Sequence, residues 1–153
     1  MKYPIEKLKG MKGKWFMFIH HELPLEIATE SIEIRAAYVK AWKAPHEVHS
    51  RLNAMRPISV RRVPKKVQAA QAALIKADNA DDSAAAALLR AKGTVAERRA
   101  EKVSEKAWDN YVEAITTYRE ALKAEHPAIL KLIEEEGIPW DDEKKTLIFE
   151  EKN

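Results

Sequence analysis

The sequence has no cysteine among its 153 residues and only four glycines. Without cysteine there are no disulfides, no thiolate chemistry and no cysteine-ligated zinc or iron–sulfur centres. The few glycines form no GxGxxG or P-loop motif, and no serine stands in a nucleophile-elbow context. We therefore expect neither an enzyme nor a bound cofactor.

Long hydrophobic runs are also missing. The longest strongly apolar run, Trp15–Ile19, is about a quarter of the roughly 20 residues needed to cross a bilayer. The run is also too short to be the apolar region of a signal peptide, and the polar residues His20, His21 and Glu22 follow it directly. The sequence predicts no membrane association and a cytoplasmic location, which the lack of cysteine fits.

Acidic residues are scarce in the first half of the chain. Residues 1–66 contain 14 basic and 6 acidic residues, a net charge of +8. Residues 67–153 contain 13 basic and 18 acidic residues, a net charge of −5. A polyanion would therefore prefer the first half.

The positive charge is densest between residues 51 and 66, a segment called the basic stretch below. It contains six cations and no acid: Arg51, Arg56, Arg61, Arg62, Lys65 and Lys66. Such a cluster predicts salt-dependent contacts to nucleic-acid phosphates that do not depend on base sequence, with Lys40 and Lys43 as outer contacts. The alternative is a connector whose cations pair with carboxylates of the protein's own acidic half.

The second half has helical composition almost throughout. The pattern predicts a helix over residues 65–78, a kink or turn at 79–82, and helix again up to Gly93. Thr94 and Glu97 have capping-box spacing, which predicts a new helix from Thr94 to about Glu125. A short helix follows Pro127 and ends at Gly137. The alanine-rich segment 69–91 favours a helical hairpin or an oligomeric coiled coil.

One apolar stripe runs along the predicted helix 94–125. Its members recur at spacings of three and four residues: Trp108, Tyr111, Ile115, Tyr118 and Leu122. This spacing predicts a packed core or a protein–protein seam, including a seam between copies of the chain. A platform on which bases stack is the competing interpretation.

The first half is expected to mix strands and helices. Residues 14–19, 58–63 and 145–150 have strand-like composition and predict one small antiparallel sheet that joins the two ends of the chain. Residues 24–43 favour a helix by the spacing of Ile32, Ala36 and Val39, although residues 31–35 also alternate like a strand. A further helix is expected from Pro45 to Pro57.

Clusters of histidine and carboxylate do not predict a catalytic or metal site. The histidines at positions 20, 21, 46 and 49 could converge, but His46 and His49 are three residues apart, unlike the four of a zinc-binding HExxH helix. The acids at 134–136 and 141–143 are read as a solvated surface. No metal is expected.

These patterns predict a mostly α fold, in which a helical hairpin or small bundle joins a minor α+β portion with short antiparallel strands. Residues 1–64 form the basic α+β portion, and residues 65–153 form the hairpin with an acidic tail. The expected function is a non-enzymatic adaptor or inhibitor that binds another protein. The small, cysteine-free, charge-rich composition resembles that of phage and mobile-element accessory proteins, which implies host machinery as a target. The alternative is a nucleic-acid-associated protein.

Overall fold

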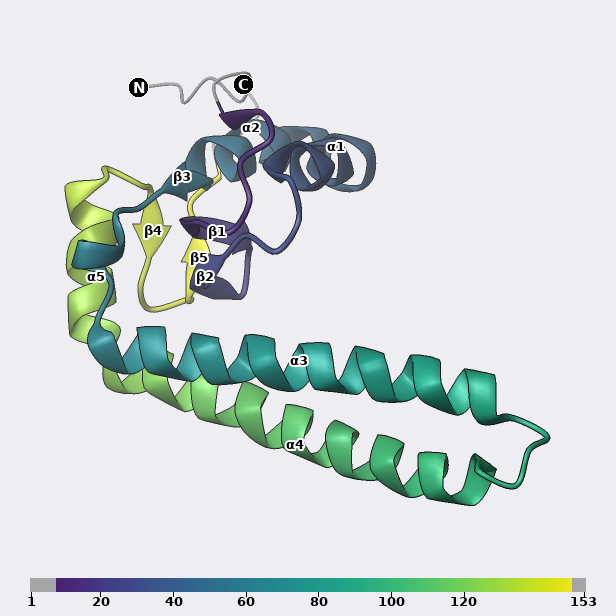
Figure 1. Cartoon of the computed structure of the whole chain (residues 1–153). Helices are drawn as coiled ribbons and strands as arrows, with labels where there is room; N and C mark the ends of the chain where they lie inside the picture. Colours follow the sequence, from purple (N-terminus) through teal and green to yellow (C-terminus); the bar gives the residue numbers. More distant parts are fainter. Residues whose placement is uncertain (1–7, 150–153) are drawn as a thin grey trace. The chain divides into compact units, whose positions relative to one another are not determined.

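The computed structural model describes residues 8–149. The predicted mostly α class with a minor α+β portion is confirmed. No helix within the described range is long and apolar enough to cross a membrane. In chain order the elements are β1 (Trp15–His20), β2 (Leu23–Ile27), α1 (Ile32–Trp42), α2 (Pro45–Ala54), β3 (Arg56–Pro57), a 3-10 helix (Val60–Arg62), α3 (Lys65–Ala91), α4 (Glu97–Ala124), α5 (His126–Glu135), β4 (Trp140–Asp141) and β5 (Thr146–Leu147) (Figure 1).

Internal contacts divide the chain into two compact units. The α+β unit contains the described residues up to Val63 and those from His126 onward, and the hairpin unit contains Pro64–Glu125. The first boundary between the units lies between Val63 and Pro64. Residues 126–149, which the sequence alone groups with the hairpin, share their contacts with the N-terminal residues instead.

Two small antiparallel sheets replace the single sheet expected from sequence. One has the strand order β2-β1-β3 and the other pairs β4 with β5. The expected strand over 58–63 is wrong, because only Arg56–Pro57 pairs with β1 and Val60–Arg62 turns into a 3-10 helix. Within the described residues, the expected C-terminal strand pairs with β4 rather than with β1. Residue 150 lies outside them.

Strand β1 is irregular, and five of its six residues are buried in succession. Its register against β2 shifts between Met17 and His20, and Phe18 has a positive φ of 49°. A bulge of this kind turns the residues after it relative to the sheet. As a result Phe16 and Ile19 both enter one core cluster, and Phe18 packs against the ring of Trp140.

Helix α1 begins later than the sequence predicts. Residues 23–27 form the edge strand β2, where Pro24 is tolerated because an edge strand does not need every amide hydrogen. The helix then starts at Ile32, and its buried residues are Ile32, Ala36 and Val39. The expected spacing is therefore right for residues 32–42, whereas a helix over 24–31 is wrong. Ile32 and Ala36 join the core cluster with Phe16 and Met55.

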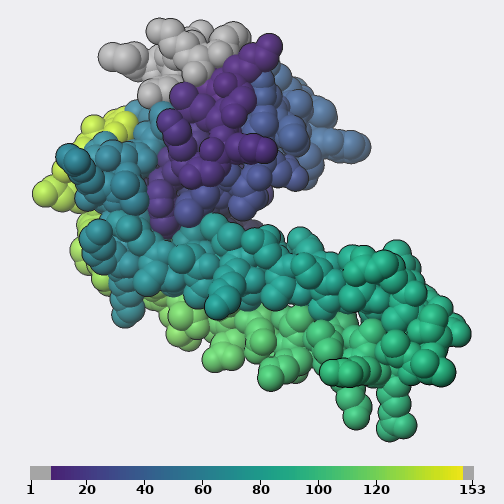
Figure 2. Space-filling model, in the orientation of Figure 1, coloured from purple at the N-terminus to yellow at the C-terminus, as the bar shows by residue number. Residues whose placement is uncertain are grey.

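Helices α3 and α4 pack against each other as a helical hairpin. Side chains fill the space between them over most of their length (Figure 2). Positions spaced alternately by three and four residues are buried or half-buried on both helices, as in a heptad seam. On α3 they are Val67, Ala70, Leu74, Ala77, Asp81, Ala84, Leu88 and Ala91; on α4 they are Ala100, Ser104, Ala107, Tyr111, Ala114, Tyr118, Ala121 and Glu125.

The expected break at residues 79–82 does not exist, because α3 is continuous from Lys65 to Ala91. The heptad spacing runs through this segment and carries Asp81 into the seam, so tertiary packing overrides the local turn chemistry. At the start of α4 the helix begins at Glu97 rather than at Thr94. Thr94 and Glu97 still accept amide hydrogens there, from Ala96 and Gly93 respectively.

The predicted apolar stripe divides between the seam and the surface. Tyr118 and Leu122 are buried, and Tyr111 and Ile115 are half-buried. Trp108 leaves 55% of its surface exposed and rests its ring against that of Tyr111, 5.5 Å between centroids. Alanines at 107, 114 and 121 alternate with Tyr111 and Tyr118 along the seam, so the true seam lies to one side of the predicted stripe.

Candidate functional site

The basic stretch does not present its six cations as one surface. Arg51 donates a hydrogen bond from Nε to Glu47 Oε2, at 3.3 Å, and its guanidinium lies 5.3 Å from the centroid of the Phe149 ring. Only 12% of the Arg51 side chain is exposed. This residue is therefore held within the α+β unit by one turn of α2 and by an aromatic ring.

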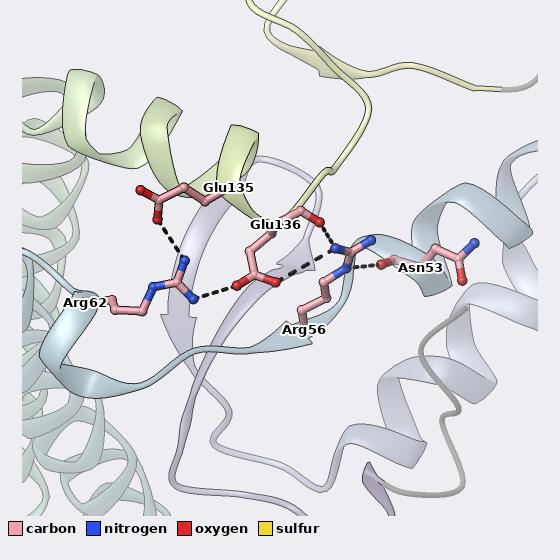
Figure 3. Close-up of polar contacts among 5 residues, drawn as sticks. All are labelled: Asn53, Arg56, Arg62, Glu135 and Glu136. Carbon is pink, nitrogen blue, oxygen red and sulfur yellow. Dashed lines mark hydrogen bonds and ion pairs between the residues drawn. The ribbon is translucent and has the colours of Figure 1, made fainter. Parts of the chain in front are cut away.

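Arg56 and Arg62 lie at the C-terminus of α5 (Figure 3). Gly137, with a φ of 63°, ends this helix as expected, and the amide of Ile138 donates to the carbonyl of Ile133 at 3.1 Å. The turn leaves the Glu136 carbonyl outside the helical ladder, and Arg56 Nη1 donates a hydrogen bond to it. Arg56 Nε donates to the carbonyl of Asn53 at 2.9 Å.

The Glu136 carboxylate joins the two arginines. It lies 3.8 Å from Arg56 Nη1 and 2.6 Å from Arg62 Nη1, and Arg62 Nη2 reaches Glu135 at 3.0 Å (Figure 3). Hydrogen bonds from Arg62 to Glu136 and Glu135 raise the pKa of the Arg62 guanidinium. Two cations at the negative end of a helix dipole are also electrostatically favourable. This arginine–glutamate cluster is a structural feature of the α+β unit.

The other three cations of the basic stretch are exposed. Arg61 lies in the 3-10 helix, and Lys65 and Lys66 begin α3, whose N-cap Pro64 provides no side-chain cap. No carboxylate in the described part of the chain forms an ion pair with any of these three. The phosphate-binding role of the stretch stays a prediction that depends on Arg61, Lys65 and Lys66.

The histidines do not gather around one point. His20 Nδ1 lies 2.5 Å from Glu26 Oε1, whereas His21 and His46 both contact the ring of Phe149. His49 Nε2 is 2.8 Å from the amide nitrogen of Asn53. Burial lowers the pKa of His21, and the nearby Arg51 charge lowers it further. Over residues 8–149 no group of three or more potential ligands could hold a metal ion.

The α+β unit presents an apolar helix face that the sequence analysis did not identify. Ile34, Tyr38 and Trp42 are spaced by four residues on α1, and they leave 56%, 44% and 76% of their surfaces exposed. Ala37 and Ala41 lie exposed on the same side. We call these five residues the α1 apolar face. Because Ile32, Ala36 and Val39 fill the core side, α1 is apolar on two opposite sides.

Cations border the α1 apolar face. The Arg35 guanidinium lies 4.7 Å from the centroid of the Tyr38 ring, and Lys43 Nζ lies 5.6 Å from it. Lys40 is exposed on the same helix. Cation–π contacts hold two of these charges over the aromatic ring and fix the orientation of Tyr38. The face therefore combines an exposed Trp, an exposed Tyr and a positive border.

A signal for this face exists in the sequence. The spacing of Ile34, Tyr38 and Trp42 is as helical as that of Ile32, Ala36 and Val39. Sequence alone shows two apolar stripes on one helix, and it does not show which stripe the core covers. Lys43, which the sequence suggests as an outer phosphate contact, lies beside the exposed ring of Tyr38, and Lys40 is exposed.

No family model, no curated protein and no solved structure matches the chain.

Proposed function

We propose that the protein is a non-enzymatic adaptor or inhibitor, and that it binds another protein through the α1 apolar face. The observation that carries this proposal is a helix that is apolar on both sides but covered on only one. Helices of this kind are normally buried all round, because apolar surface is costly to leave in water. Trp, Tyr and Arg are also the residue types that dominate binding energy at protein interfaces.

The border of the face indicates the chemistry of the partner. Arg35, Lys40 and Lys43 give it a positive rim, so the complementary surface is an apolar groove or helix bordered by carboxylates. A second copy of the chain fits less well, because a two-fold contact through α1 would bring the same three cations together. An acidic protein surface is therefore the occupant we propose.

Trp42 is expected to contribute most to binding. Burying a Trp side chain removes roughly 150–250 Å² from water, and interface hot spots cost about 2 kcal/mol or more on truncation. We therefore expect Trp42→Ala to weaken the complex at least about 30-fold. Tyr38→Ala should weaken it by a smaller factor, because Tyr38 is already partly covered by Arg35 and Lys43.

The test begins with a photo-reactive phenylalanine analogue in place of Ala41, which is exposed on the same face, in the full chain, so that Trp42 is retained. A partner crosslinked in cells is then produced in pure form, and its affinity is measured for the wild type, Tyr38→Ala and Trp42→Ala. Trp108→Ala is the matched control, because Trp108 is an exposed tryptophan on the hairpin unit and belongs to the predicted protein-binding stripe. Capture alone does not support the proposal; the reconstituted affinities decide.

The outcomes separate the two surfaces. Loss of affinity in Trp42→Ala with none in Trp108→Ala supports the α1 apolar face. Loss only in Trp108→Ala moves the interface to the stripe Trp108–Leu122, and loss in neither variant contradicts both surfaces. If the pure chain is a dimer that Trp42→Ala dissociates, the occupant is a second copy rather than an acidic partner.

The nucleic-acid alternative is supported by the exposed Arg61, Lys65 and Lys66. Its test is binding of the pure protein to labelled DNA and RNA at two salt concentrations. Three phosphate contacts would give a slope of log affinity against log salt of about −2 to −3. Under this alternative, replacing all three cations by alanine removes binding, whereas the α1 variants leave it unchanged.

A further inference from the structure

A second feature of the α+β unit is a cavity that Arg35 also lines. This cavity of about 260 Å³ is lined by His20, Glu26, the segment 28–32 that leads into α1, and Arg35. Ile19, Ala28 and Ile32 supply apolar lining, and Glu30 adds a carboxylate. A cavity of this size accommodates a small organic group rather than only a solvent molecule.

Glu26 is the unusual residue of the cavity. Only 8% of its surface is exposed, although it lies on an edge strand. Its Oε1 lies 2.5 Å from His20 Nδ1, whereas its Oε2 is buried and, among residues 8–149, has no hydrogen-bond donor. A buried charged acceptor without a donor is unfavourable by several kcal/mol in general. Glu26 Oε2 is therefore an unsatisfied acceptor within the described residues.

The backbone around His20 holds this arrangement in place. Phe18 has a positive φ, and the register shifts between Met17 and His20. His20 therefore lies opposite Leu23, whereas an unshifted register would place it opposite Glu22. Strained backbone of this kind persists only where the surrounding structure fixes it, and it occurs often at binding sites. His20 thereby pairs with one Glu26 oxygen, and the other oxygen has no donor among residues 8–149.

We propose that this cavity binds an organic cation that carries N–H donors, a guanidinium or a primary ammonium, with the Glu26 carboxylate as its opposite charge. The carboxylates of Glu26 and Glu30 favour a cation and oppose an anion. Arg35 also lines the cavity, but its Nε donates to the Ile19 carbonyl at 2.7 Å and its guanidinium lies over Tyr38. The apolar lining suits the short alkyl stem of the ligand.

The test is a titration of the full-length protein followed by amide NMR shifts of residues 26–32. Methylguanidinium and methylammonium are the cationic probes, and N-methylurea is the neutral probe with nearly the same shape as methylguanidinium. We expect saturable shifts with either or both cations and none with N-methylurea. Shifts of equal size with N-methylurea, or no saturable shifts with either cation, would overturn the proposal without any variant.

A matched pair of variants locates the site. Glu26→Gln should weaken binding at least tenfold, because the amide removes the charge and offers a donor in place of one acceptor oxygen. Glu22→Gln, which changes an exposed carboxylate in the same hairpin outside the cavity, should leave binding unchanged. Equal binding by the wild type and a folded Glu26→Gln variant would contradict the assignment to Glu26.

The cation could be a free small molecule or the side chain of a bound protein. The same NMR titration with agmatine and with a capped Gly-Arg-Gly peptide distinguishes the two, since a cavity closed around a free ligand rejects the peptide. Binding of both assigns the cavity to a protein-borne arginine, and binding of agmatine alone assigns it to a free amine. Trp42 does not line the cavity, so failure of this proposal leaves the α1 proposal untouched.

Discussion

Arg56, Arg61 and Arg62 lie within seven residues of each other and carry the same charge, yet their surroundings differ. Arg56 donates to two backbone carbonyls and lies beside Glu136, with 11% of its side chain exposed. Arg62 pairs with Glu135 and Glu136 but remains more than a third exposed, and Arg61 is exposed. The role of each arginine follows from these partners rather than from its charge.

The first prediction compares the three arginines by truncation. Arg56→Ala should lower the free energy of unfolding of the α+β unit by about 2–3 kcal/mol, because it leaves the Asn53 and Glu136 carbonyls without that donor. Arg62→Ala should cost no more than about 1 kcal/mol, since solvent screens an exposed ion pair. Arg61→Ala is the control and should stay within about 0.5 kcal/mol. Urea unfolding measures all three, and equal costs would contradict these roles.

The second prediction concerns acid stability through Asp142. Hydrogen bonds from Lys145 Nζ and from Trp140 Nε1 are the main causes that lower the pKa of Asp142 from 3.8 to about 2, and His126 contributes less. Because the folded state prefers the ionised carboxylate, its contribution to stability is fully present above about pH 4. It is lost as pH falls through the folded pKa near 2.

The measurement is the melting temperature of the wild type and of Asp142→Asn at pH 6 and at pH 2. The wild type should be more stable at pH 6, and the difference should shrink toward pH 2. Glu143→Gln changes an exposed neighbour and is the control, which should show no such pH-dependent difference. A gap between wild type and Asp142→Asn that is unchanged at pH 2 would contradict the ionised role of Asp142.

At the scale of elements, the hairpin seam distributes its large side chains unevenly. In the half away from the 92–96 loop the seam contains Val67, Leu74, Tyr111 and Tyr118, whereas nearer the loop Leu88 is its one large apolar residue and most positions are alanine. An alanine seam lets the helices approach closely but buries little apolar area for each residue. The stability of the hairpin is therefore expected to depend on the few large residues in the half away from this loop.

The third prediction compares two aromatic residues on α4. Tyr118 has no exposed surface, so Tyr118→Ala should cost about 3–5 kcal/mol through lost burial and the cavity that remains. Trp108 is more than half exposed, so Trp108→Ala should cost less than about 1 kcal/mol. Loss of helical circular dichroism in urea measures both. A larger cost for Trp108→Ala than for Tyr118→Ala would contradict this assignment and would indicate that the stripe predicted from sequence forms the seam.

At the scale of the whole molecule, the chain consists of two units with separate sets of internal contacts. The fourth prediction is that these units open separately. Hydrogen exchange measured by mass spectrometry should show a change in protection near residues 63–64 and 125–126. The slowest amides are expected in β1, and the fastest hairpin amides near the 92–96 loop. One uniform protection level across both boundaries would contradict this division.

Much of the fold follows from local signals. Pro45 at the start of α2 and Gly137 after α5 mark the starts and stops that the sequence predicts. The mostly α class and the helical hairpin likewise follow from composition and from spacings of three and four residues. These features can be read from sequence because a helix satisfies its backbone within one segment, and its caps lie within a few residues of its ends.

Other features depend on residues far apart in the chain, and only the tertiary structure decided them. Glu135 and Glu136, which pair with Arg62 and Arg56, lie more than 70 residues away, β5 pairs with β4 rather than with β1, and an Asp occupies a seam position of α3. The core also selects which of two equivalent apolar stripes on α1 it covers. A strand's partner, an ion pair between distant residues and an exposed face are properties of packing, because each depends on what lies opposite in space. Spacing along one segment does not contain that information.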